Sequence, residues 1–313
     1  MAGEKSKTSG EIGEKIAGRL LEKIGWAGSL KNIPIPCNTR SHVNEAGNQR
    51  TSHGEDRVFF YNNPFYDART DVVHVSVKNK SGAYSASEAT LKRQFKEHLA
   101  ELHEIIECAI YSEEINEALS NFKPKRNVFH SGLLIWLSND LDSIDSDVKP
   151  ALANMLIEQE SAIPVYLLDA SRASFLMKIL DDVQRRGMPW SFYLPEVMGT
   201  SLTVDESRNK KFLPLELLAS DIVPILISDG EKRELIIYAD QPFGGNAYKK
   251  LMAYGFKFSG GAIPNIRIGM PDYNASRDLS EAQRVRLSFS EREEKVEPFS
   301  FNRSFLALLD EGE

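Results

Sequence analysis

Cysteine is scarce in this chain, which has only Cys37 and Cys108 among its 313 residues. Two cysteines so far apart in the sequence predict neither a disulfide framework nor a cysteine-rich zinc site. The longest strongly apolar runs, GLLIWL and IVPILI, are too short to cross a bilayer, and the opening MAGEKSKTSGE has no apolar signal core. We therefore expect a soluble protein of the reducing cytoplasm that makes no membrane contact.

An excess of positive charge is also missing. The chain has 38 Lys and Arg residues against 45 Asp and Glu residues, which gives a net charge of −7. No global positive field therefore attracts nucleic acid, and any contact with it depends on a local patch.

The chain also lacks a P-loop and a Gly-rich dinucleotide turn. This absence disfavours a nucleotide-binding α/β enzyme built on residues 131–195.

The hydrophobic content of 42% is sufficient for a globular core. Near the start, apolar residues recur every four positions: Ile12, Ile16, Leu20 and Ile24. This period predicts an amphipathic helix, with Thr8 and Glu11 at capping-box spacing and Gly25 at its end. Residues 38–54 are polar and predict a loop that contains His53, which either reaches a site or braces the turn.

Two strands are predicted next, at 56–62 and 71–78. In the second, valines at 73, 75 and 77 alternate with His74, Ser76 and Lys78. Because successive side chains of a strand point to opposite faces, the valines face the core and the polar residues face a site or solvent.

Further along, helical and strand patterns alternate, which is typical of an α/β fold. Helices are expected from about 88 to 111, near 148–160, at 171–186 and near 246–254. Strands are expected at 131–137, 163–168, 190–194 and 264–269, with a hairpin that turns around Asp229 and Gly230. The polar stretch 196–212 separates two expected domains, 1–195 and 196–313.

Three stretches in this order resemble the PD-(D/E)XK nuclease superfamily, in particular Mrr-type restriction endonucleases. GEKIAGRLLEKIGW resembles the first helix, with Glu14 at the position of its glutamate. GEDRVFFY resembles the strand with the first metal-binding aspartate, here Asp56, and HVSVKNK resembles the strand with the acid-X-Lys element, whose lysine is Lys78. The resemblance covers roughly residues 10–138. The chain is also similar to the nuclease subunit of a two-gene bacterial anti-phage defence system.

The resemblance implies a restriction-endonuclease-like core, a mixed sheet flanked by helices, with a C-terminal α/β extension. It implies an Mg²⁺- or Mn²⁺-dependent DNA endonuclease in which Asp56 and Glu14 hold the ion and Lys78 stabilises developing charge. Ser76 departs from the pattern, because it stands where the family usually has an acid or Gln. A catalytically degenerate DNA-binding or assembly subunit is therefore the alternative interpretation.

Two expectations concern partners. Lys80, Lys92, Arg93 and Lys96 form the most basic stretch near the motif. They either follow a DNA backbone or form a solvated helix face, and Glu88 and Glu97 between them favour the second interpretation. Residues 196–313 have no recognisable chemistry, so we expect them to dock a second protein encoded in the same operon, in a hetero-oligomer.

Overall fold

The computed structural model describes residues 2–44, 46–157, 162–194, 208–230 and 232–302. The chain divides into two compact units, Met1–Ser174 and Phe175–Glu313, and each contains one β-sheet with helices packed against it. This confirms the α/β class. The division comes before the boundary at 195 that the sequence suggests, because strand β6 (Trp190–Tyr193) pairs with β8 (Ile222–Asp229) in the second sheet. Residues 196–207 of the expected polar boundary lie outside the described residues.

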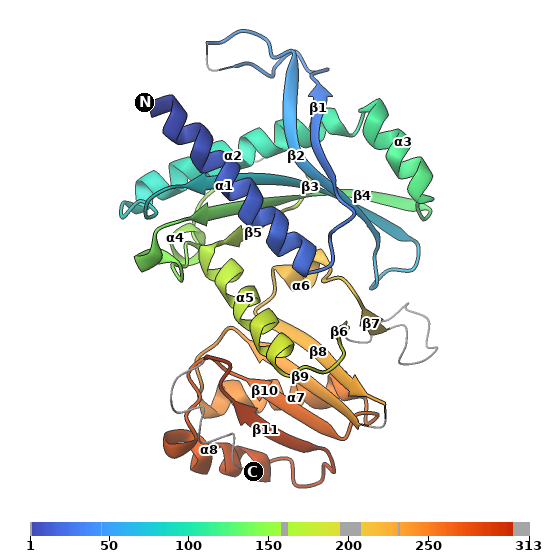
Figure 1. Ribbon diagram of the computed structural model, residues 1–313, viewed down its shortest axis with the longest axis vertical. Helices are drawn as coiled ribbons and strands as arrows, with labels where there is room; N and C mark the ends of the chain where they lie inside the picture. Colours follow the sequence, from blue (N-terminus) through green and yellow to red (C-terminus); the bar gives the residue numbers. More distant parts are fainter. Residues whose placement is uncertain (1, 45, 158–161, 195–207, 231, 303–313) are drawn as a thin grey trace. The chain divides into compact units, whose positions relative to one another are not determined.

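The first unit is built on a mixed five-stranded sheet in the order β1-β2-β3-β4-β5 (Figure 1). Its strands are β1 (Leu30–Pro36), β2 (Ser52–Asn62), β3 (Arg69–Lys80), β4 (Asn127–Ser138) and β5 (Val165–Asp169). The first three pair antiparallel, and β3, β4 and β5 pair parallel. A mixed sheet with helices on its faces is the restriction-endonuclease-like arrangement that the sequence predicts.

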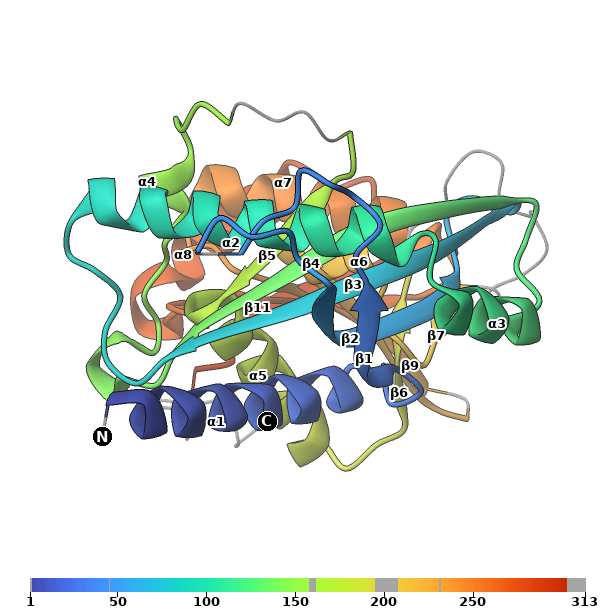
Figure 2. The ribbon, with the colours of Figure 1, turned by 90° about the horizontal axis from the view of Figure 1, so that it is seen from above.

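Helices cover both faces of this sheet. Helix α1 (Ala2–Lys23) lies on one face, and α2 (Glu88–Ala109) lies on the other (Figure 2). On the α2 side, Val58 and Val72 share a core cluster with Cys108 and with residues of α3 (Glu113–Phe122). Just after α1, Trp26 stacks on Phe59 with ring centroids 4.7 Å apart. Burial of these apolar surfaces holds both helices to the sheet.

Strand β3 is therefore buried on both faces. Val73 and Val75 are 0% and 1% exposed, and the polar residues His74 and Ser76 are only 0% and 4% exposed. The predicted alternation holds, since Lys78 contacts α2 whereas Asn79 contacts α1. The polar face is not a solvated face, because α2 covers it.

Helix α1 differs from the prediction in two respects. It begins at Ala2, so Thr8 and Glu11 lie inside the helix and do not cap its start. Leu20 and Ile24 are buried as predicted, but Ile12 and Ile16 are 44% and 42% exposed. The four-residue period follows a line that rotates away from the sheet, because the α-helix has 3.6 residues per turn.

Small residues let α1 approach the sheet closely. A Cβ atom on Gly13 would lie 2.3 Å from the Cβ atom of Asn79, so that a side chain there would force the helix and strand apart. The Asn79 amide donates to the carbonyl oxygen of Ser9 at 2.7 Å, which fixes the register of helix against strand. The close approach at Gly13 also places Glu14, the residue that follows it, against this part of the sheet.

The rest of the first unit is simpler. Two short elements, the 3-10 turn Leu141–Ser143 and α4 (Lys149–Leu152), follow β4. Only the first part of the helix expected at 148–160 forms, and residues 158–161 lie outside the described residues. Strand β5 leads directly into α5 (Ala170–Arg185), where the Asp169 carboxylate accepts the backbone N–H of Arg172 at 2.9 Å.

The second unit contains a six-stranded sheet in the order β11-β10-β9-β8-β6-β7. Its remaining elements are β7 (Asn209–Lys210), α6 (Leu215–Leu218), β9 (Lys232–Ala239), α7 (Gly245–Ser259), β10 (Asn265–Gly269), α8 (Ala275–Leu287) and β11 (Lys295–Phe299). Strands β8 and β9 form the predicted hairpin, with Asp229 opposite Lys232. Across the described part of the chain, no helix has an apolar stretch long enough to span a bilayer.

Gly10 and Gly13 of α1 allow a matched test of the helix contact. Gly13→Ala should lower the free energy of unfolding of the first unit by about 1–3 kcal/mol, because the new Cβ overlaps Asn79. Gly10→Ala meets no atom within 4 Å and should raise it by up to about 1 kcal/mol through helix propensity. Urea denaturation of both variants measures the difference. Effects of the same sign would contradict the close approach of α1.

Candidate active site

The carboxylate of Asp56 lies near the start of β2, at the point where β2 leaves its ladder with β3. Its Oδ2 atom accepts the backbone N–H of Val77 at 2.7 Å. Burial raises the pKa of Asp56 above its usual range, against the lowering effects of the Val77 hydrogen bond and of Lys78, and the charge of Glu101 raises it further. Asp56 is therefore a desolvated carboxylate whose negative charge a cation would stabilise.

Lys78 and Glu101 meet beside Asp56. The Lys78 ammonium on β3 donates to Oε2 of Glu101 on α2 at 2.7 Å, and the two side chains are 24% and 40% exposed. Both charges act on the pKa of Asp56, in opposite directions. The structure thus brings Asp56 and Lys78 together, as the sequence predicts, and adds an acid that the motif search missed.

The acid next to Asp56 has a different environment. Oε1 of Glu55 lies 2.7 Å from Nδ1 of His74, and Nε2 of His74 lies 2.9 Å from Nδ1 of His130. Glu55 and His74 are almost fully buried, and burial lowers the pKa of His130 to about 4. Glu55 is therefore held in a row of polar side chains, Glu55, His74 and His130, that runs across the sheet. This leaves Asp56 as the carboxylate of the site.

Glu14 lies on α1, on the other side of the sheet from α2. Burial raises the pKa of Glu14, and the charge of Asp56 raises it further, so the two carboxylates are close enough to interact. Among the described residues, Glu14 has no hydrogen bond or ion pair of its own. Glu101, by contrast, lies on the same side of β3 as Lys78. The geometry thus offers two acids near Asp56, one from each helix.

Ser76 is 4% exposed and pairs in register with Leu134 of β4. Its hydroxyl is a neutral oxygen, so the position contributes no negative charge. The oxygen donors of the site are the carboxylates of Asp56, Glu101 and Glu14, a set that suits a hard cation such as Mg²⁺ or Mn²⁺. Burial makes the charges of Asp56 and Glu14 costly without a cation, so the donor set fits such an ion.

The basic stretch lies mainly at the start of α2. Lys92 forms an ion pair with Glu88, and Arg93 forms one with Glu97 at 2.8 Å, each one turn along the helix. Lys80 ends β3, and both Lys80 and Lys96 are exposed. Two of the four positive charges are therefore compensated by neighbouring glutamates.

Sequence reasoning missed Glu101 and His98, because both belong to a helix that the motif does not include. Burial lowers the pKa of His98, and the charge of Lys78 lowers it further, which places His98 beside the lysine. Their spacing of three residues on α2 would have placed them on one helix face. His53 lies in β2 itself, is 4% exposed, and contacts His42 at 3.3 Å.

Comparison with protein families identifies the first unit. The family model of the GAPS4 protein PD-(D/E)XK nuclease domain matches residues 1–172, more than half of the chain. No curated protein and no solved structure matches. The match confirms the resemblance drawn from the stretches around Glu14, Asp56 and Lys78.

The raised pKa of Asp56 predicts a gain in stability when its charge is removed. A carboxyl group with a folded pKa above the unfolded value stabilises the fold at low pH, and this contribution is lost as the pH rises through the folded pKa. Asp56→Asn keeps an acceptor for the Val77 N–H and should therefore raise the melting temperature at pH 7 in EDTA. The difference from the wild type should shrink as the pH falls toward 3.8, the usual pKa of aspartate.

Asp71 provides the matched control. Its carboxylate is 1% exposed and accepts hydrogen bonds from Arg69 at 2.8 Å and from Asn63 at 2.6 Å. Asp71→Asn should lower the melting temperature at pH 7, because it leaves a charged partner uncompensated. A fall for Asp56→Asn as large as for Asp71→Asn would show that Asp56 has a structural role only.

Proposed function

The chain belongs to the GAPS4 PD-(D/E)XK nuclease family, and we propose that it hydrolyses phosphodiester bonds of DNA with a divalent metal ion, as the effector of a bacterial anti-phage defence complex. The observation that supports this most directly is the position of Asp56. Its desolvated carboxylate lies beside the Lys78–Glu101 ion pair, so an anionic ligand set and a cationic donor meet at one point.

Members of this nuclease superfamily generally use divalent metals. In this chain Asp56 would anchor the ion, and Glu101 would supply the carboxylate that Ser76 lacks. Glu14 would complete the negative charge around Asp56 from α1. When bound, the ion lowers the pKa of a water molecule and neutralises charge on the phosphate.

Lys78 would supply a positively charged hydrogen-bond donor. Its ammonium is held by Glu101 at 2.7 Å and is only partly exposed, so it is already oriented before a substrate arrives. A donor fixed in this way stabilises charge that develops on the phosphate without reorganising during the reaction. The carboxylate of Asp56 is likewise oriented before a substrate arrives, by the hydrogen bond that it accepts from the Val77 N–H.

A degenerate nuclease fold that only binds DNA or assembles a complex is the second candidate, and Ser76 is the observation in its favour. Glu101 argues against it, because an acid at this place restores the charge that Ser76 removes.

We also propose that residues 196–313 dock a second protein encoded in the same operon, since an acidic chain gains DNA contacts from such a partner.

Cleavage assays on linear and circular DNA, with Mg²⁺, Mn²⁺ or EDTA and with or without the neighbour-encoded protein, test the proposal. Asp56→Asn and Lys78→Met should each reduce the rate at least about 100-fold, as expected when a preorganised charge is lost. Glu101→Gln should raise the metal concentration for half-maximal rate at least about tenfold, an affinity loss of about 1.4 kcal/mol. Glu14→Gln should change it less, because Glu14 acts through its charge on Asp56.

Three outcomes would contradict these assignments. If Asp56→Asn cuts at the wild-type rate, the site lies elsewhere. If the wild-type chain cuts under none of the conditions but still binds DNA, the degenerate alternative holds. A larger effect of Glu14→Gln than of Glu101→Gln would make α1 the source of the second ligand.

We propose that DNA passes the basic stretch of α2, and the salt dependence of binding tests this. Each phosphate neutralised on duplex DNA contributes about −0.9 to the slope of log affinity against log salt. Replacing Lys92, Arg93 and Lys96 together by Ala should flatten the slope by roughly two to three units. The matched control replaces the exposed Lys249, Lys250 and Lys257 of α7 by Ala, and its slope should equal the wild type. Equal slopes for both triple variants would show that α2 is a solvated face.

A further inference from the structure

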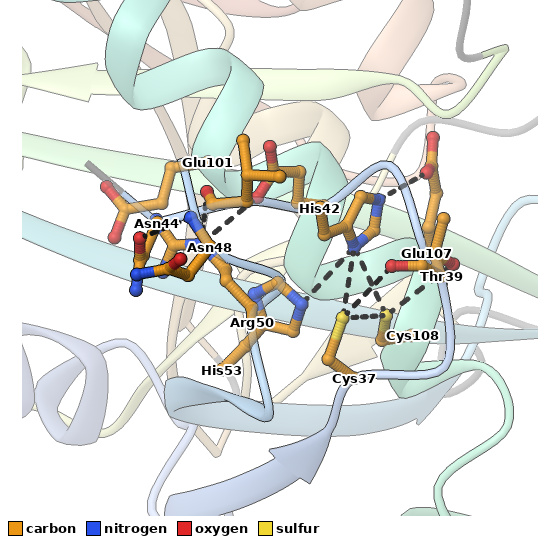
Figure 3. Close-up of polar contacts among 12 residues, drawn as sticks. Cys37, Thr39, His42, Asn44, Asn48, Arg50, His53, Glu101, Glu107 and Cys108 are labelled. Carbon is orange, nitrogen blue, oxygen red and sulfur yellow. Dashed lines mark hydrogen bonds and ion pairs between the residues drawn. The ribbon is translucent and has the colours of Figure 1, made fainter. Parts of the chain in front are cut away.

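Four side chains with metal-binding atoms converge away from Asp56, between the β1–β2 connection and α2. They are Cys37, His42, His53 and Cys108, and their ligand atoms all lie within 4.8 Å of one another. Cys37 follows β1, His42 lies in the connection, His53 is on β2, and Cys108 is in the last turn of α2 (Figure 3). The fold thus joins two cysteines that are 71 positions apart, which spacing in the sequence alone does not reveal.

Four of the six separations among these atoms match those around a tetrahedral ion, and the other two, from His53 to the sulfurs, are within 4.8 Å. Bonds of about 2.3 Å to sulfur and about 2.05 Å to nitrogen imply about 3.8 Å between two sulfurs, about 3.6 Å between sulfur and nitrogen, and about 3.3 Å between nitrogens. The two Sγ atoms are 4.0 Å apart, and they lie 3.6 Å and 3.4 Å from Nδ1 of His42. Nδ1 of His42 lies 3.3 Å from Nε2 of His53. All four separations agree within about 0.2 Å, the tolerance expected of a metal site.

Hydrogen bonding alone does not account for the arrangement around His42. Its Nδ1 atom has three neighbours at 3.3–3.6 Å, two sulfurs and one ring nitrogen. A ring nitrogen either donates one hydrogen or accepts one, so it satisfies one of the three. His53 is 4% exposed, and its other nitrogen, Nδ1, has no hydrogen-bond partner among the described residues. One cation at the centre would satisfy all four inward-facing atoms together.

The surroundings fit a metal-bound histidine. Nε2 of His42, the nitrogen that faces away from the cluster, lies 3.3 Å from Oε2 of Glu107 on α2. A carboxylate on the far nitrogen of a ligating histidine fixes its tautomer and orients the ring, as in many zinc sites.

We propose that Cys37, His42, His53 and Cys108 form a closed four-coordinate structural site for Zn²⁺. Two thiolates and two imidazoles are the donor set that zinc prefers in structural sites, and four protein ligands fill its tetrahedral coordination, which leaves no position for a substrate. The site is distinct from the oxygen-rich site at Asp56, and it stands whether or not the chain cleaves DNA.

The ion would hold the β1–β2 connection against α2. Direct contacts between them include the ion pair of Arg50 with Glu104 at 3.5 Å and the contact of His42 with Glu107. His53 lies three residues before Asp56 on β2, and Cys108 lies two turns after Glu101 on α2. Zinc would therefore fix β2 and α2, which carry Asp56 and Glu101 of the proposed active site.

Metal analysis of the reduced, full-length chain tests the site. After reconstitution with Zn²⁺ and gel filtration, the wild type should retain about one zinc per chain, as a single closed site requires. Cys37→Ser, Cys108→Ser and His42→Gln should each lose most of it. The matched controls are His98→Gln, a histidine of α2 outside the cluster, and Asp56→Asn, which removes the carboxylate of the other site. Both should retain zinc at the wild-type level.

A second measurement needs no variant and so does not depend on the folding of one. Cobalt in place of zinc should give the visible bands of a tetrahedral ion and a thiolate charge-transfer band in the wild type, and added Zn²⁺ should abolish both. A wild-type chain that binds neither ion would overturn the proposal. So would a Cys37–Cys108 disulfide found in mass spectra of the chain prepared with reductant, or equal zinc content in the cysteine variants and the wild type.

Discussion

The negative charge of Asp56 is the constraint around which the first unit is arranged. Burial disfavours this charge, and the nearby carboxylate of Glu101 disfavours it further. The backbone N–H of Val77 and the ammonium of Lys78 offset only part of the cost. A fold tolerates such a cost when function requires it and stability is supplied elsewhere. Here it comes from the two helices packed on opposite faces of the sheet.

Helix α2 connects most of the features that bear on chemistry. Its side chain at 101 pairs with Lys78, the one at 104 pairs with Arg50, and the one at 108 lies among the histidines of the cysteine cluster. Gly132 of β4 makes room for it, since a Cβ there would lie 2.9 Å from Leu102. A helix held so closely along its length transmits its position to each of these contacts. Any displacement of α2 would therefore disturb both proposed metal sites at once.

The sequence predicted the fold well where the pattern is local. The alternating valines of β3 gave the strand and its two faces, and the hairpin at Asp229 followed from its turn residues. Prediction failed where a contact joins distant segments. Ile12 and Ile16 follow a helical period but lie exposed, because Gly13 is the residue that meets the sheet.

The candidate site shows the same limit. The family resemblance of their strands pointed to Asp56 and Lys78 as candidates, and the antiparallel pairing of β2 with β3 brings these strands together. Glu101 lies 23 positions after Lys78 on a helix of ordinary composition, so its role depends on how α2 packs. The histidines and cysteines of the cluster are separated by a polar connection and by two strands. No spacing rule unites them, since only the tertiary fold closes that distance.

The charge balance of the chain links the proposed chemistry to binding. The net charge of −7 and the carboxylates around Asp56 repel a phosphate backbone. Lys92 and Arg93 are already paired with glutamates on their own helix, so they reduce this repulsion only in part. Under the proposed function a divalent cation at Asp56 would reverse the local sign of charge. The ion would thus be required for the approach of DNA to the site as well as for the attack on it.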